Sequence, residues 1–138
     1  MSNRDDLNQQ VITEFRANGG KVGGRHTGAP ILLLHSTGAR TGQTRVNPVM
    51  FQAVGDSFAI FATKGGAPTN PDWYHNLVAN PRATVEIGTE TIEVTARTAR
   101  SDEREPIWTC QKERYPVFAE YERRTSRQIP VMILERAK

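Results

Sequence analysis

Three strand-like segments follow one another closely in the first half of the chain, and this spacing constrains the fold more than any other feature. An apolar run covers residues 31–34, and two further extended segments cover 46–54 and 58–63. Gly55-Asp56, between the last two, is typical of a tight hairpin turn. We therefore expect neighbouring strands joined by hairpins.

The second half of the chain repeats this pattern with helices inserted. Residues 84–87 and 91–96 predict a hairpin around Gly88-Thr89, and 129–134 predict a last strand. Pro130 lies near the start of that strand, where a missing N–H is tolerated. Six short, mostly antiparallel strands predict a mainly β (α+β) fold, a small barrel with helices on one side.

Helical spacing of Leu7, Val11, Ile12 and Phe15 predicts a helix from Asn3 to about Asn18, ended by Gly19-Gly20. We expect this helix to pack on the body of the protein, and peripheral contact with the inner face of a membrane is the alternative. The predicted organisation is an N-terminal helix over residues 1–20, a linker to about 30, and a barrel domain over 30–138.

Three more helices are predicted from their starting residues. Asn70 is expected to cap a helix over 72–79, with Pro71 in its first turn. Ser101 is expected to cap a charged helix from 102 to about 114. Pro116 is expected to begin a short helix that reaches about residue 124.

Composition limits the function. The chain has 138 residues, a net charge of +3 and a pI near 9.4, which favours anionic ligands but falls short of a dedicated nucleic-acid binder. A lone cysteine fits a cytoplasmic protein without disulfides, and three scattered histidines predict no metal site. No catalytic side-chain set emerges, so enzymatic chemistry would have to come from a cofactor.

Two loops have the composition of anion-binding sites. His35 to Pro48 combines two glycines, three threonines and two arginines, which suits a phosphate held at a hairpin tip, although an ordinary polar turn is the alternative. Residues 63–66, Thr-Lys-Gly-Gly, follow the third strand, and the helix after Asn70 presents a positive end nearby.

Two aromatic groups allow either core packing or a binding role. Trp73 and Tyr74 are more typical of core residues. Tyr115, Phe118 and Tyr121 recur at helical spacing, which is usual for a core but would also suit the wall of a pocket for a flat, apolar substrate.

The segments TGARTGQTRVNP, TKGGAPTNPDWYHNL and ANP, in this order and spacing, resemble the deazaflavin-dependent nitroreductase family, whose members bind coenzyme F420. The similarity runs from about Leu32 to Arg97 and continues more loosely beyond it. It implies a six-stranded split β-barrel like that of flavin reductases. It also implies an F420-dependent reductase that passes a hydride from C5 of the reduced cofactor to a quinone, nitroaromatic or activated enone.

The resemblance also implies site residues. The cofactor would be held by Ala39, Arg40, Thr41, Gly42, Arg45, Val46, Asn47, Pro48, Val49, Met50, Phe61, Ala62, Thr63, Lys64, Gly65, Asp72, Trp73, Tyr74, His75 and Asn76. The acceptor would face Met50, Thr63, Tyr115, Phe118 and Tyr121. Lys21, Arg25 and His26 would attract the polyglutamate tail of the cofactor. No side chain is implied as a catalytic residue, because the cofactor carries the reactive atom.

Three positions depart from the resemblance. Related sequences often carry Tyr in place of Met50 and Phe118, and Ser in place of Thr63. These changes remove or crowd polar groups at the acceptor site, so we expect flat, apolar quinones to be preferred over bulky nitroaromatics.

Three other functions remain open on the sequence. One is an FMN-dependent or pyridoxamine-phosphate-oxidase-like enzyme on the same barrel, and another is a deazaflavin carrier without turnover. Nucleic-acid binding is suggested by the pI alone and is not expected. The expected partner is a small-molecule electron acceptor, and a monomer is favoured.

Overall fold

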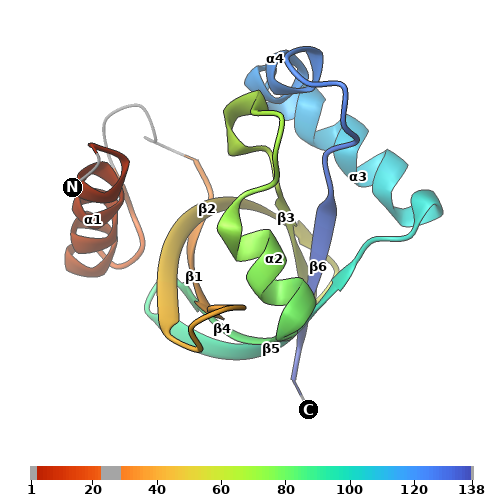
Figure 1. The fold of residues 1–138 in the computed structure, drawn as a ribbon. Coiled ribbons are helices and arrows are strands. Elements are labelled where there is room, and N and C mark those ends of the chain that lie inside the picture. The colour runs from red at the N-terminus through yellow and green to blue at the C-terminus, as the bar shows by residue number, and fades with distance from the viewer. Residues whose placement is uncertain (1–2, 23–28, 138) are drawn as a thin grey trace.

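Six antiparallel strands close into a barrel in the computed structural model, which describes residues 3–22 and 29–137 (Figure 1). The strands are β1 (Ile31–Thr37), β2 (Thr44–Val54), β3 (Ser57–Phe61), β4 (Arg82–Ile87), β5 (Glu90–Thr98) and β6 (Val131–Arg136). They follow the order β1-β2-β3-β6-β5-β4, and β4 pairs with β1 to close the barrel. The predicted fold class is confirmed.

The four helices expected from the sequence are present near their predicted places, together with a 3-10 turn that the sequence did not predict. They are α1 (Asn3–Ala17), the short 3-10 turn η2 (Lys64–Gly66), α2 (Asp72–Ala79), α3 (Ser101–Arg114) and α4 (Val117–Arg123). As expected, Gly19 and Gly20 end α1 with positive φ angles of 63° and 96°.

Two predicted helix caps are wrong. Pro71, not Asn70, occupies the cap position of α2, because the Asn70 Oδ1 atom accepts a hydrogen bond from Arg127 Nη1 at 2.6 Å instead. At α3 the cap residue is Arg100, and Ser101 is already helical. The Glu103 carboxylate accepts the Arg100 backbone N–H at 3.0 Å, so a reaching carboxylate replaces the expected serine hydroxyl.

The interior of the barrel is filled by one apolar cluster that α2 completes. Leu32, Leu34 and Ile60 are fully buried and share this cluster with Trp73 and Leu77 of α2. Figure 1 shows α2 lying across one end of the barrel. The core interpretation of Trp73 is therefore confirmed, and burial of its ring anchors α2 over the barrel mouth.

Two further clusters cover the outer face of the barrel. Helix α1 packs Ile12 and Phe15 against Ile31 and Leu33 of β1, whereas α3 and α4 pack against β3 and β6. Met50 of β2 contacts both clusters, so it lies between the two helical layers.

An ion pair adds to the docking of α1. The Arg16 guanidinium donates to both carboxylate oxygens of Glu86 on β4, at 3.2 and 2.8 Å, and His35 Nε2 lies 2.5 Å from the same carboxylate. The hydrogen bond from Arg16, together with that of His35, lowers the pKa of Glu86.

In the described part of the chain, no helix combines the length and apolarity needed to cross a membrane.

Candidate cofactor and acceptor site

The β1–β2 hairpin is folded tightly and is tied to α2. Gly38 N–H donates to the Gln43 carbonyl at 2.8 Å, and a Cβ at Gly38 would lie 2.7 Å from Thr41 Oγ1. Ala39 N–H donates to Asn76 Oδ1 at 3.0 Å, and Asn76 Nδ2 donates to the buried Ser36 Oγ at 3.2 Å. The hairpin is thus held in place by the side chain of Asn76.

The hairpin tip presents its polar residues to solvent. The exposed members of the implied cofactor set here are Ala39, Arg40, Thr41, Gly42 and Arg45. The structure therefore leaves two arginines exposed on the same hairpin, Arg40 in its turn and Arg45 near the start of β2, whereas Asn76 is buried and engaged in internal hydrogen bonds. Ser36, which the sequence did not single out, completes this support.

The η2 segment has an unusual backbone. Lys64, Gly65 and Gly66 all have positive φ angles, of 47°, 64° and 84°. A Cβ at Gly66 would lie 2.8 Å from Arg124 Cβ and 2.9 Å from the Tyr121 carbonyl oxygen, so this turn packs directly against α4. Lys64 is partly exposed, and its Nζ donates to Thr69 Oγ1 at 3.2 Å.

Arg127 holds this segment from the far end of the chain. Its guanidinium donates to the carbonyl oxygens of Ala67 and Thr63, at 3.0 and 2.9 Å, and to Asn70 Oδ1. Partial burial lowers the pKa of Arg127, but an arginine stays cationic in a protein. Sequence reasoning missed this residue, because an arginine in a loop carries no signal of a contact about sixty residues away.

The first half of β2 has strand pairing on one edge only. Residues 44–50 pair with β1, whereas β3 pairs with β2 only from Phe51 onward. Pro48, opposite Leu33, has no N–H to give, and Phe51 N–H donates to the Pro30 carbonyl on the β1 side. Because backbone groups alternate in direction along a strand, those of Val46 and the Pro48 carbonyl point toward the edge that no described strand covers.

Four of the five implied acceptor residues meet in one apolar cluster. Phe118 is buried at its centre, with its ring centroid 5.6 Å from that of Phe61 and 5.5 Å from that of Tyr121. Met50, Tyr115 and Tyr121 are partly buried members of the same cluster. We call this group, with Phe118, the aromatic wall. Thr63 is not in this cluster, but it precedes the η2 turn that packs on α4.

A polar contact fixes α4, which carries two residues of the aromatic wall, against α3. Trp108 Nε1 donates to Glu122 Oε2 at 2.5 Å, and Lys112 Nζ lies 3.0 Å from Glu122 Oε1. The indole hydrogen bond, aided by Lys112, lowers the pKa of Glu122.

The remaining implied residues divide by position. Val46, Asn47, Pro48 and Val49 are partly buried along β2, Phe61 at the end of β3 and Ala62 just after it are buried, and Gly65 is exposed. Asp72 and His75 are exposed on α2, and Tyr74 is partly buried beside His75, with ring centroids 5.4 Å apart. Arg25 and His26 lie outside the described residues.

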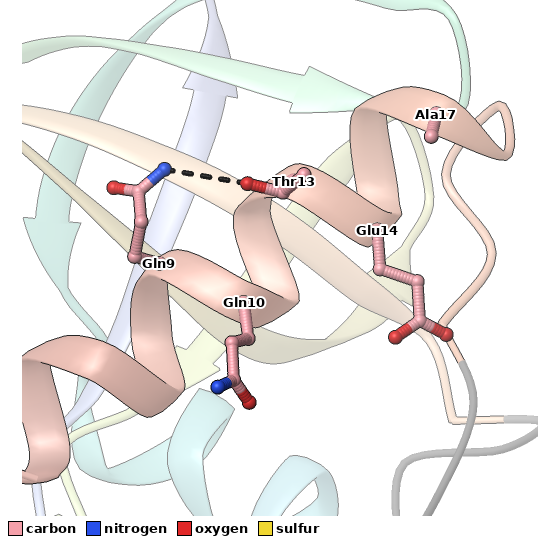
Figure 2. Close-up of a pocket in the computed structure, with 5 residues that line it drawn as sticks. All are labelled: Gln9, Gln10, Thr13, Glu14 and Ala17. Carbon is pink, nitrogen blue, oxygen red and sulfur yellow. Dashed lines mark hydrogen bonds between the residues drawn. The ribbon is translucent and has the colours of Figure 1, made fainter.

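Two surface hollows involve other residues. Figure 2 shows one lined by Gln9, Gln10, Thr13, Glu14 and Ala17, all from α1, so it is a shallow groove along a single helix. The other lies among the ends of β1, β2, β4 and β5 and includes His35 and Arg82. Within residues 3–22 and 29–137, no three His, Cys, Asp or Glu side chains are placed to hold a metal ion.

Comparison with known proteins decides the family. Residues 7–136 match the family described as F420H(2)-dependent quinone reductase. The chain belongs to this family. An F420H(2)-dependent quinone reductase of Mycobacterium tuberculosis is 40% identical over 126 residues, which cover 88% of this chain and 85% of that protein.

Solved structures agree with this assignment. A structure described as an F420-H2 dependent reductase, FDR-A, is 42% identical with a TM-score of 0.70, and the match covers 77% of this chain and 94% of that one. A structure described as a domain-swapped dimer is 38% identical with a TM-score of 0.72 and covers 97% and 100% of the two chains. A pyridoxamine 5'-phosphate oxidase-like structure from Listeria innocua, 12% identical with a TM-score of 0.57, shares the fold alone.

Membership of the family of F420H(2)-dependent quinone reductases confirms the sequence-based resemblance. The chain is an oxidoreductase whose cofactor is reduced F420 and whose acceptor is a quinone. This finding favours the deazaflavin function over the FMN alternative on the same barrel.

Proposed function

We propose that F420 binds along the open edge of β2, between the β1–β2 hairpin and the η2 segment, with its reactive carbon toward the aromatic wall. The observation that carries this proposal is the arrangement around α2. The hairpin is bonded to Asn76 in the middle of this helix, and the η2 segment leads into its first turn. Two cationic loops that are far apart in sequence are thereby attached to the same short helix.

The charges of these loops fit the cofactor. F420 carries a phosphodiester and a polyglutamate tail, and both are anionic. Arg40 and Arg45 are exposed at the hairpin, and Lys64 lies on the other loop. An arginine that binds a phosphate with two parallel hydrogen bonds is stronger than an exposed ion pair, so the arginines would supply most of the affinity.

The open edge of β2 fits the flat ring. A deazaflavin has alternating C=O and N–H groups on its pyrimidine side. The free backbone groups of Val46 and the Pro48 carbonyl offer matching partners, and a backbone edge is a rigid one. The ring would then lie beside Met50, where the strand reaches the aromatic wall.

When bound, the reduced cofactor supplies a hydride from C5. The polypeptide then has three tasks: to orient the acceptor, to exclude water and to stabilise negative charge on the acceptor oxygen. Met50, Tyr115 and Tyr121 offer a largely apolar surface that favours a flat quinone. Because Met50 and Phe118 lack a hydroxyl, we propose that bulky nitroaromatics are poorer acceptors.

A charge-removal experiment tests the placement of the cofactor. Arg45→Ala combined with Lys64→Ala should raise the Kd for F420, measured by cofactor fluorescence, about tenfold or more, which corresponds to about 1.4 kcal/mol. The control is Arg123→Ala combined with Arg136→Ala, which removes the same charge from α4 and β6. Unchanged affinity in the first pair, or an equal loss in both, would contradict the phosphate assignment.

Turnover tests the activity itself. Under anaerobic conditions the wild-type protein should oxidise F420H2 with menadione, followed by the return of F420 absorbance and fluorescence. Binding of F420 without oxidation by any quinone would instead support a carrier, and tight binding of FMN alone would favour the flavin alternative.

A further inference from the structure

Gln111 is a buried amide with an unused donor. Its side chain lies on the inner side of α3 and is fully buried. Among the buried side-chain atoms of the described residues, Gln111 Nε2 is the one without a hydrogen-bond partner. Such a donor costs stability, so its presence calls for a physical reason.

The orientation of this amide is fixed by its neighbours. Gln52 Nε2 donates to the Ile107 carbonyl oxygen at 3.1 Å and to Gln111 Oε1 at 3.2 Å. A backbone carbonyl can only accept, so Gln52 must turn its nitrogen toward Ile107. Gln111 must then present its oxygen to Gln52, since the opposite orientation would set two donors against each other. The Nε2 group of Gln111 therefore points elsewhere.

Its surroundings belong to the aromatic wall. Gln111 follows Ile107 by one turn of α3, so the two share a face of this helix, and Tyr115 caps the helix four residues after Gln111. Met50 and Gln52 are two residues apart on β2, so their side chains lie on the same face of this strand. Ile107, Tyr115 and Met50 all lie in the cluster that contains Phe118. Gln111 thus lies beside the apolar layer behind the proposed acceptor site.

Quinone reduction needs a donor at this place. The quinone takes up a hydride from C5 of F420H2 and a proton from water, and the oxidised cofactor releases its N1 proton to solvent. Negative charge develops on a quinone oxygen before that oxygen is protonated, and a positioned N–H stabilises it. Met50 and Phe118 contribute no hydroxyl here, so beside the hydroxyls of Tyr115, Tyr121 and Thr63 the amide of Gln111 is a further side-chain donor close to this layer.

We propose that Gln111 Nε2 is this donor, binding a carbonyl oxygen of the quinone once a flat ring has displaced the partly buried side chains of Met50 and Tyr115. The proposal rests on the proposed function and assigns its specificity: an acceptor with a hydrogen-bonding oxygen at the edge of a flat ring. Met50 suits this displacement, because methionine is unbranched and adapts to its neighbours.

Replacement of Gln111 by Met tests the proposal, since methionine has a similar length and no donor. Its kcat/KM for menadione at saturating F420H2 should fall about tenfold, and its Kd for menadione should rise about as much. The Kd can be measured without cofactor by quenching of tryptophan fluorescence, because Trp108 lies three residues from Gln111. The Kd for F420 and the melting temperature should stay near wild type, because the substitution also removes an unpaired buried donor.

Gln111→Glu is the second variant and keeps an oxygen for Gln52. Protonated, the carboxylic acid can donate, whereas the ionised form can only accept. Quinone reduction by this variant should therefore be retained at low pH and lost as pH rises through the glutamate pKa, a dependence that wild type lacks.

Three results would overturn the proposal. The first is an unchanged Kd and kcat/KM for menadione in Gln111→Met, which would mean that a buried water satisfies the amide. The second is an equal loss of F420 and menadione binding, which would make Gln111 a structural residue. The third is a pH profile of Gln111→Glu that follows wild type. Wild-type protein that binds menadione but fails to oxidise F420H2 would refute the proposed function separately.

Discussion

At the scale of single residues, Arg127 shows how a distant side chain can shape a binding loop. Its three hydrogen bonds reach Thr63, Ala67 and Asn70, which bracket Lys64 in the chain. Lys64 has a positive φ of 47°, a conformation that costs energy for a residue with a side chain. We therefore expect Arg127 to maintain the conformation of Lys64 on which the proposed phosphate contact depends.

Arg127→Ala should weaken F420 binding about tenfold, yet leave unchanged the affinity for the deazaflavin riboside that lacks the phosphate and tail. The substitution removes hydrogen bonds to two carbonyls and an amide and so frees the Lys64 loop, which in the proposed site contacts the phosphate. Fluorescence titration with both compounds measures the difference.

Arg124→Ala is the matched control for this prediction. Arg124 is exposed, packs its side-chain stem close to Gly66 and donates one long hydrogen bond of 3.4 Å to the Gly65 carbonyl oxygen of the same segment. An equal weakening of both compounds by Arg127→Ala would show a general structural effect and contradict the positioning role.

Residue-level prediction succeeded where a local signal existed. Core packing was the favoured interpretation of Trp73 from its residue type, although the resemblance also implied a cofactor contact, and Trp73 is buried in the barrel cluster. Ser36, Gln111 and Arg127 carry no local signal, since their roles come from partners that folding brings together. The predicted caps at Asn70 and Ser101 were wrong. The side chain of Asn70 binds Arg127 instead, and at α3 the Glu103 carboxylate accepts the backbone N–H of Arg100, which is the actual cap residue.

At the scale of elements, the start of α3 depends on a carboxylate. Glu103 accepts hydrogen bonds from Arg97 Nη1 and Nη2, at 2.7 and 2.8 Å, and from the Arg100 backbone N–H. These bonds, with that of Arg97 the strongest, lower the pKa of Glu103 from 4.5 to about 2. They join the end of β5 to the first turn of α3.

This shift predicts an acid dependence of stability. Because the folded pKa lies below the unfolded value, the contribution of Glu103 is full above pH 4.5 and is lost as pH falls toward 2. The free energies of unfolding of wild type and Glu103→Gln should therefore differ near neutral pH and converge in acid. Denaturant titrations across this range measure it, with Glu113→Gln as the exposed control on the same helix. A gap that persists at pH 2 would contradict the prediction.

Some element boundaries were predictable, because turns and helical periodicity are local, whereas β1 extends three residues beyond its predicted end and β6 begins and ends two residues later than predicted. The α2 helix has the expected bounds, and Gly55 and Gly88 turn two hairpins with positive φ. The stop of β3 at Phe61, two residues early, was not predictable from β propensity. It depends on the following residues, where Ala62 N–H donates to the Pro130 carbonyl and the chain then turns into η2.

At the scale of the whole molecule, α1 behaves as an added layer on a complete barrel. It contributes Ile12 and Phe15 to a small cluster on β1, and Arg16 reaches Glu86 on β4. The same cluster includes Met50, so the layer borders the proposed acceptor site. We propose that α1 nevertheless unfolds together with the barrel, as one cooperative unit.

Phe15→Ala should then lower the free energy of global unfolding by about 3 kcal/mol, the usual cost of removing a buried phenyl ring. Phe15 is 1% exposed, whereas Thr13 on the same helix is exposed, so Thr13→Ala is the control. Denaturant unfolding followed by tryptophan fluorescence reports on the barrel through Trp73. An unchanged midpoint for Phe15→Ala would show that α1 detaches independently.

Pro48 has a further consequence for the resistance of this protein to aggregation in solution. A bare strand edge normally recruits foreign polypeptide and seeds aggregates. Pro48 has no N–H, so it interrupts the row of backbone donors on the part of β2 that β3 does not pair with. A second chain could therefore not form a continuous strand pairing there. The deazaflavin ring needs only a few hydrogen-bond partners, so the missing N–H of Pro48 would not prevent it from binding at this edge. The same proline would thus disfavour pairing with a second chain while still allowing a small ligand to bind at the strand edge.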